Sequence, residues 1–152
     1  MIRDYYLFSD LNGKEADIVK ERMFLKKITK DTLIFEEGDS IDAIFFINKG
    51  DVEIYKNVKE GKKQNVLNLH RGDFFGEVGV LENKDSKRFA SAIAITELEV
   101  LVLLKSDFNR IMKENTEIEY KIYKSFLYEM IGRLRLADNR IREFFKETLK
   151  DS

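Results

Sequence analysis

The chain has 152 residues, 43% of them hydrophobic and 12% aromatic, which is enough for one buried core of ordinary domain size. Its 27 lysine and arginine residues are balanced by 28 aspartate and glutamate residues, so no long-range field attracts nucleic acid, anionic lipid or acidic substrates. The lack of cysteine and the presence of one histidine, His70, exclude disulfides, thiolate–metal sites and a multi-histidine metal site within one chain.

The first predicted element is a short helix over Lys14–Met23, where apolar residues recur at helical spacing behind turn residues. From about residue 24 to residue 104, short runs of β-branched and aromatic residues alternate with Gly, Asp and Asn. The predicted strands are Thr32–Phe35, Ala43–Asn48, Val52–Lys56, Asn65–Leu69, Ser91–Ile95 and Leu98–Leu103. No crossover helices separate them, which favours an antiparallel β-roll (a double-stranded β-helix or jelly roll) over a parallel sheet. Gly50 and Gly61 bracket a predicted hairpin.

Helical spacing returns after Asp107, and a long helix is predicted over about residues 116–150, where Gly132 is the single helix breaker. Its apolar residues alternate by four and three, the pattern of a coiled-coil seam, at Tyr123, Leu127, Met130, Leu134, Ala137, Ile141 and Phe144. This stripe either packs on the roll of its own chain or joins two chains. Its length favours the second interpretation, as do the flanking residues Arg133, Arg135, Arg140 and Arg142.

The predicted elements form one mainly-β domain with flanking helices over residues 1–152. It comprises a helical cap at about 8–24, the β-roll at about 25–104, and C-terminal helices at about 105–150, with no proline and no linker-like segment between them. The N-terminus lacks the apolar segment of a signal peptide, and no run of 18 apolar residues occurs. We therefore expect a cytoplasmic protein without membrane contact.

The candidate binding chemistry lies in the segment 72–80 and in Arg88, which follows Glu77 by eleven residues. Gly76 and Gly79 permit close backbone approach, and a short helical turn there would offer free amides to an anion. Arg88 supplies a forked set of donors suited to phosphate, while Glu77 can only accept and suits a sugar hydroxyl. These residues predict a site for a phosphorylated sugar. The same residues also fit a partly buried Glu77–Arg88 ion pair beside ordinary turn glycines.

The order Gly38-Asp39, Gly50, Gly72-Asp73, Phe75-Gly76-Glu77, Arg88 and a long last helix with Arg133-Leu134-Arg135 resembles the cyclic-nucleotide-binding domain family over about residues 8–144. The resemblance implies a phosphate-binding cassette at about residues 75–90. In it, Glu77 would hold the ribose 2′-hydroxyl, Arg88 the cyclic phosphate, and the long helix would cover the base. The ligand-binding residues that the resemblance implies are Phe75, Gly76, Glu77, Val78, Gly79, Arg88, Phe89, Ala90, Ala137 and Asp138. Of the last two, which match the adenine-reaching positions, Asp138 alone can hydrogen-bond through its side chain.

The resemblance further implies a sensor, with cyclic AMP ahead of cyclic GMP as ligand. It also implies a homodimer of the catabolite-activator type, through Met130, Leu134, Ala137, Ile141 and Phe144. Because the chain stops at Ser152, before the DNA-reading helices of such transcription factors, we expect no direct DNA binding and output through a protein effector.

Phe89 stands where the family has a small residue, which favours an alternative function: a roll that has lost its ligand and serves as a dimerisation or protein-interaction module. The sequence contains neither a Walker phosphate loop nor the glycine fingerprint of dinucleotide-binding folds. We therefore expect no enzymatic activity, no catalytic residues, no metal and no cofactor.

Overall fold

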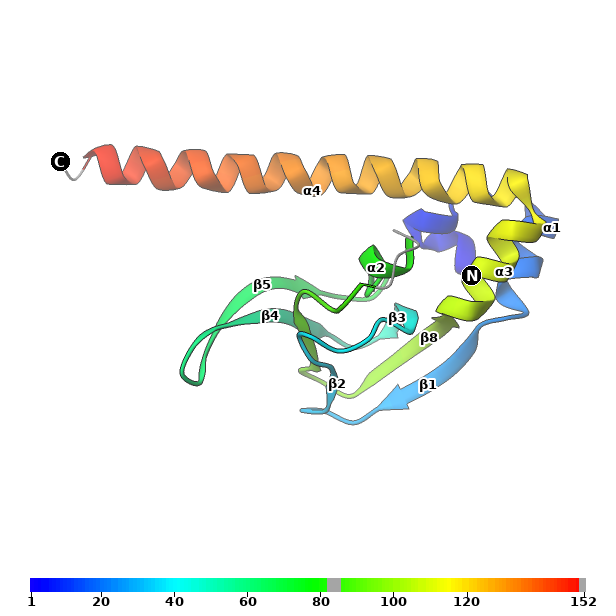
Figure 1. The fold of residues 1–152 in the computed structure, drawn as a ribbon, viewed down its shortest axis with the longest axis horizontal. Helices are drawn as coiled ribbons and strands as arrows, with labels where there is room; N and C mark the ends of the chain where they lie inside the picture. The colour runs from blue at the N-terminus through cyan, green and yellow to red at the C-terminus, as the bar shows by residue number, and fades with distance from the viewer. Residues whose placement is uncertain (82–85, 151–152) are drawn as a thin grey trace.

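The computed structural model describes residues 1–81 and 86–150 and shows a β-roll with helices packed at one end (Figure 1). Two four-stranded antiparallel sheets make the roll, with strand orders β1-β8-β3-β6 and β2-β7-β4-β5. The strands are β1 (Phe24–Ile28), β2 (Leu33–Phe35), β3 (Ala43–Lys49), β4 (Val52–Lys59), β5 (Lys62–Leu69), β6 (Phe74–Phe75), β7 (Ser91–Ala94) and β8 (Leu98–Leu104). The helices are η1 (Ile2–Asp4) and η2 (Tyr6–Phe8), both 3₁₀, then α1 (Gly13–Lys20), α2 (Val78–Leu81), α3 (Lys105–Glu114) and α4 (Thr116–Lys150).

The predicted fold class is confirmed: an antiparallel roll, a short N-terminal helix and a long C-terminal helix. Each predicted strand corresponds to an observed one, although β4 and β5 extend further toward their shared turn, where Glu60 and Gly61 adopt positive φ. Two strands were not predicted. In β1, Ile28 alone is buried, so the residues show no alternating pattern, and β6 is two residues long.

The N-terminal helix begins and ends earlier than its pattern predicts. Asn12 caps α1, because its side chain accepts a hydrogen bond from the Glu15 amide while the Glu15 carboxylate accepts one from the Asn12 amide. The predicted end at Met23 was wrong, since α1 ends at Lys20 and Met23 directly precedes β1. Lys121 of α4 bridges to Glu15 at 2.6 Å and so ties the capped end of α1 to α4.

Strand β3 is buried on both faces, which explains its uninterrupted apolar run. Ile44 and Phe46 join the core formed with the N-terminal helices, α3 and the start of α4, whereas Phe45 and Ile47 face the space between the two sheets. Phe74 and Phe75 of β6, which pair with β3, lie on the same two faces of the sheet. Phe45 stacks on Phe75 with ring centroids 5.1 Å apart, and Phe46 lies 5.8 Å from Phe74.

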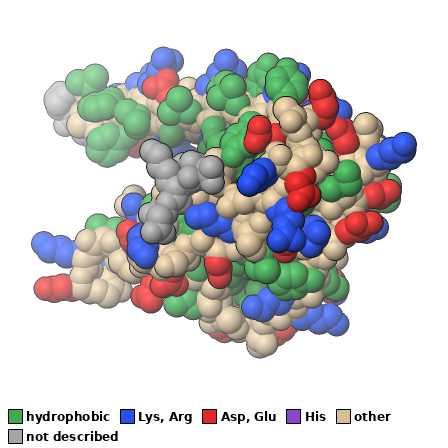
Figure 2. Space-filling model, turned by 45° about the vertical axis from the view of Figure 1, so that its right-hand side comes forward, with side chains coloured by type: hydrophobic (Ala, Val, Ile, Leu, Met, Phe, Trp, Pro, Cys, Tyr) green, Lys and Arg blue, Asp and Glu red, His purple; other side chains and the backbone are tan. Residues whose placement is uncertain are grey.

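Helix α4 begins in the core and ends beyond the roll. Its first turns bury Ile118, Ile122 and Ser125, and its later turns pass over the roll and project past it above the β4–β5 hairpin (Figure 1). Hydrophobic side chains gather on the projecting part (Figure 2). The exposed ones from Leu127 onward include Leu127, Leu134, Leu136, Ile141, Phe144, Phe145 and Leu149. Over residues 1–81 and 86–150, no helix has the length and apolar character needed to cross a membrane.

Candidate functional site

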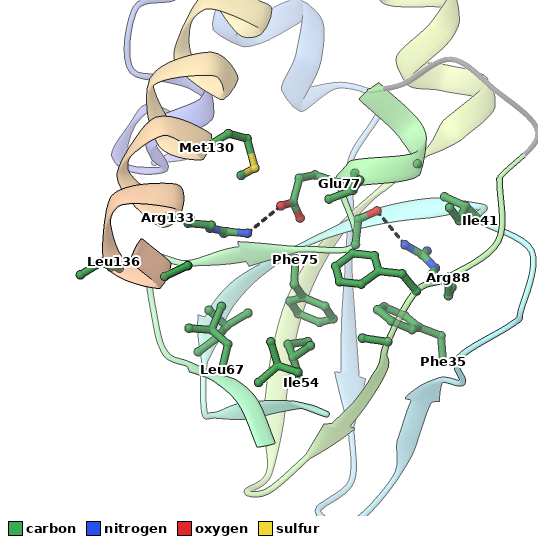
Figure 3. A pocket seen from close by; sticks show the side chains of 18 of the residues that line it. Phe35, Ile41, Ile54, Leu67, Phe75, Glu77, Arg88, Met130, Arg133 and Leu136 are labelled. Atoms are coloured by element: carbon green, nitrogen blue, oxygen red, sulfur yellow. Dashed lines mark hydrogen bonds and ion pairs between the residues drawn. The ribbon is translucent and has the colours of Figure 1, made fainter. Parts of the chain in front are cut away.

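A cavity of about 310 Å³ lies between the roll and α4 (Figure 3). This volume is within the range of small-molecule sites. Its wall is mainly apolar, with side chains from β2, β4 and β5 on the roll and Met130 and Leu136 on α4. Among the described residues of the lining, the charged side chains are Glu77, Arg88, Arg133 and Arg140. The cavity thus combines an apolar enclosure with a few polar groups, as expected of a site that binds one compact ligand.

Arg88 is fixed at one end of the cavity by backbone pairing and by its side-chain contacts. Its amide donates to the Asp39 carbonyl, and its carbonyl accepts from the Gly38 amide, beside the isolated bridge between Ser40 and Lys87. Its guanidinium lies 4.1 Å from the Phe35 ring centroid. The turn at Gly38-Asp39 therefore positions the chain segment that carries the arginine.

The Arg88 side chain is buried and incompletely bonded. Nη1 donates to the Gly76 carbonyl at 2.6 Å and Nη2 to the Ala43 carbonyl at 2.9 Å, while the nearest carboxylate contact is to exposed Asp42 at 3.4 Å. Burial lowers the pKa of Arg88, and Asp42 counteracts this. Among the described residues, its Nε is the one buried side-chain polar atom without a hydrogen-bond partner. An unfilled donor on a buried guanidinium favours binding of an anion.

Gly76 and Gly79 are required for different reasons. Gly76 has φ +80°, and a Cβ there would lie 2.8 Å from Nη1 of Arg88, so glycine allows its carbonyl to meet the guanidinium. Gly79 lies in α2, and a Cβ there would clash with the Ile41 side chain. Ile41 itself lines the cavity, so a larger residue at position 79 would reshape the binding surface.

Glu77 is directed at α4 instead of at Arg88. It is 2% exposed, and its Oε1 accepts a hydrogen bond from Nη1 of Arg133 at 2.9 Å (Figure 3). Burial raises the pKa of Glu77, and the positive charge of Arg133 partly offsets this effect. Arg133 also contacts Glu129 one turn earlier at 3.5 Å. The alternative of a Glu77–Arg88 ion pair was wrong, because the structure pairs each of the two side chains with other groups.

Most of the predicted ligand-binding residues lie together. Those that line the cavity are Phe75, Gly76, Glu77, Val78, Gly79, Arg88, Phe89, Ala90 and Ala137. Phe89 is 55% exposed at the rim, with Lys56 Nζ 5.7 Å from its ring centroid, so its ring does not fill the cavity. Asp138 is outside the lining and pairs with Arg142 at 3.3 Å on the exposed side of α4.

The structure divides the predicted seam of α4 between two faces. Met130 and Ala137 line the cavity, whereas Leu134, Ile141 and Phe144 are exposed. Arg133 and Arg140, predicted to flank a helix–helix contact, instead line the cavity. Their helical spacing from buried Ile122, at eleven and eighteen residues, would have placed them on the buried face.

The chain is similar to known proteins in sequence and in fold. The family model described as cyclic nucleotide-binding domain matches residues 25–115. The chain is 29% identical over 138 residues to a cAMP-dependent protein kinase regulatory subunit of Candida albicans, an alignment covering 91% of this chain and 28% of that protein.

Solved structures of other proteins share the fold of this chain. The Thermus thermophilus catabolite activator protein is similar with a TM-score of 0.76 and 24% identity, over 90% of this chain and 61% of that one. The regulatory domain of Toxoplasma gondii PKA, crystallised with cAMP, has a TM-score of 0.68 and 29% identity, over 82% of this chain and 47% of that one. The chain spans less than two thirds of the length of each protein named here.

Proposed function

Because this chain belongs to the cyclic nucleotide-binding domain family, we propose that it is a regulatory domain whose cavity binds a cyclic nucleotide. The observation that carries the proposal is the state of Arg88, a residue 5% exposed whose Nε has no partner among the described residues. A buried charge is costly unless an opposite charge and hydrogen bonds compensate it, and the exposed Asp42 does so weakly. A cyclic phosphate would supply both.

The rest of the ligand follows from the positions of the other groups. With the phosphate at Arg88, the ribose hydroxyl would donate to the Glu77 carboxylate, and the base would lie among the apolar side chains beneath α4. Names of two relatives support cyclic AMP as ligand: the Candida albicans subunit is called cAMP-dependent, and the Toxoplasma gondii domain was crystallised with cAMP. We retain cyclic AMP ahead of cyclic GMP on that basis.

The polar contacts between the cassette and α4 give binding a route to the helix. Arg133 bonds to Glu77, and the hydroxyl of Tyr123 donates to the Leu81 carbonyl at 3.0 Å. A sugar hydroxyl arriving at Glu77 changes the partners available to Arg133, and with them the position of α4 that is most stable. Ligand binding then shifts a two-state equilibrium of the helix by its differential affinity for the two positions.

The uncovered stripe of α4 supports a homodimer. Leu127, Leu134 and Ile141 recur every seven residues and are all exposed, Leu134 by 71%. Ile131 lies between Leu127 and Leu134, and Phe145 follows Ile141 by four residues, so both are on the same side of the helix. A second copy of this helix would cover these side chains while leaving Met130 and Ala137 in the cavity. An output protein could recognise the dimer or the moved helix.

Calorimetric titration with cyclic AMP and cyclic GMP tests the proposed ligand. Replacing Arg88 by Leu should weaken binding by about 2–5 kcal/mol, or about 30-fold to several thousand-fold, as expected when one partner of a buried charge pair is truncated. Lys87→Leu removes an equal charge from the adjacent exposed residue and should leave affinity nearly unchanged.

Because Arg88 also bonds two backbone carbonyls, Arg88→Lys keeps the charge and serves as a second variant if Arg88→Leu is unstable. Absence of heat and of thermal stabilisation with either nucleotide at millimolar concentration would contradict the proposal. It would then favour the ligand-free interaction module. Binding that Arg88→Leu leaves unaltered would place the phosphate elsewhere.

A further inference from the structure

The end of the cavity opposite Arg88 is formed by α4 and the β4–β5 side of the roll. Figure 3 places Leu136 and Leu67 there, away from Arg88. Arg140 lies one helical turn beyond Leu136, on the same side of α4, and belongs to the lining. A nucleotide whose phosphate is at Arg88 would direct its base toward this end.

The polar side chains of the lining differ in whether they are already engaged. Arg88 bonds to Gly76 and Ala43 through its two terminal nitrogens and leaves its Nε for the phosphate, while Arg133 bonds to Glu77 before any ligand binds. Arg140 is exposed and, in the part of the chain that the structure describes, makes no hydrogen bond or ion pair. At the end of the cavity where the purine would lie, the free hydrogen-bonding side chain is therefore the guanidinium of Arg140.

A guanidinium distinguishes the two purines because it can only donate. Guanine presents two adjacent acceptors, O6 and N7, which a guanidinium contacts with two parallel hydrogen bonds. Adenine presents N7 next to the N6 amino group, which is itself a donor and opposes the second bond. Ala137 and Leu136, the neighbours of Arg140 in the lining, provide no side-chain acceptor for that amino group.

We propose that Arg140 is a specificity-determining residue that reads the O6/N7 edge of guanine and raises the affinity for cyclic GMP, narrowing the preference for cyclic AMP that the names of the relatives support. This inference rests on the proposed function, since it requires a cyclic nucleotide with its phosphate at Arg88. Arg140 supplies hydrogen-bond donors that the apolar wall around it does not offer. The quantity to measure is the ratio of the affinity for cyclic GMP to the affinity for cyclic AMP.

Titrations of the full chain and of Arg140→Ala with cyclic AMP, cyclic GMP and cyclic IMP test the inference. Cyclic IMP carries the O6/N7 edge without the 2-amino group, so it isolates the contact. We expect Arg140→Ala to weaken cyclic GMP and cyclic IMP by about tenfold, the lower part of the range for a bidentate contact because Arg140 is exposed, and cyclic AMP by less than about threefold. Arg135→Ala, which removes the same charge from an exposed residue outside the lining, should weaken none of them.

The outcomes separate this inference from the function on which it rests. Equal losses for all three nucleotides would show that Arg140 acts as a plain positive charge and would overturn the inference while leaving the cyclic-nucleotide site intact. Unchanged affinities in Arg140→Ala would overturn it in the same way. Failure of the unmodified chain to bind any of the three would overturn the proposed function itself, and the inference with it.

Discussion

Replacing Arg133 by methionine would leave the buried Glu77 carboxylate without its cation while keeping an unbranched side chain at the surface of α4. Oε1 of Glu77 and Nη1 of Arg133 are 2.9 Å apart, and Glu77 is 2% exposed, so little water reaches the carboxylate to replace the lost bond. Truncating one member of a buried pair costs about 3–5 kcal/mol. Because the Arg133 side chain is 31% exposed, we expect a cost below that range, about 2–3 kcal/mol at pH 7.

The cost of Arg133→Met should depend on pH. Burial raises the pKa of Glu77, so the folded state holds this proton more tightly than the unfolded state. Glu77 therefore contributes stability at low pH, and the contribution is lost as pH rises from about 4.5 through the pKa in the folded state. Without Arg133 the folded-state pKa rises further and more stability is lost at neutral pH. As pH falls toward the unfolded-state value of about 4.5, a growing fraction of the folded-state carboxyl is neutral in both proteins, so the difference should shrink.

Urea denaturation of the unmodified chain, Glu77→Gln, Arg133→Met and the double variant at pH 7 and pH 4.5 would measure these costs. In thermal melts of the same proteins at pH 7 we expect Arg133→Met to lower the melting temperature by about 4–12 °C. The double variant should be more stable than the sum of the single costs predicts, because the amide needs no cation. Equal costs of Arg133→Met at the two pH values, or strictly additive costs in the cycle, would refute the reasoning.

Two further predictions concern other contacts of α4. The pKa of Glu15 is lowered by the hydrogen bond from the Asn12 amide and by Lys121, so its stabilisation is present above about pH 4.5 and lost as pH falls through the lowered pKa. Glu15→Gln should reduce the unfolding free energy by about 1 kcal/mol at pH 7 and by almost nothing near pH 2 in urea titrations; equal losses would contradict this. Leu134→Asp with Ile141→Asp should convert a dimer to a monomer in light-scattering measurements without weakening nucleotide binding, and an unchanged mass would remove α4 as the contact.

Strong periodic patterns in the sequence predicted the fold well, and weak local ones did not. The run at β3 was recognisable because the strand is buried on both faces, and the long helix because it lacks breakers. Strand β1 was missed because it has one buried residue, Ile28, and its place in the sheet is set by pairing with β8, which lies about seventy residues further along the chain. Long-range pairing of that kind leaves no local signal.

In the site, too, features with a local sequence signal were predicted and those set by distant parts of the chain were not. The glycines, Glu77 and Arg88 stand in one short segment, and their chemistry was readable from residue type and order. The partner of Glu77 was not, because Arg133 comes from another element 56 residues away. A heptad pattern on one helix also cannot tell which of two faces meets the roll, and for that reason Met130 was assigned only to a seam although it lines the cavity.

The double-sided packing of β6 against β3 has a mechanical consequence. Phe74 packs on Phe46 at one face of the sheet, and Phe75 packs on Phe45 at the other. These contacts hold β6 in place from both faces. Gly76, directly after it, has a backbone conformation that other residues rarely adopt. With a ligand bound as proposed, we expect displacement to begin at Gly76 and to extend through α2, while the aromatic contacts between β6 and β3 stay in place.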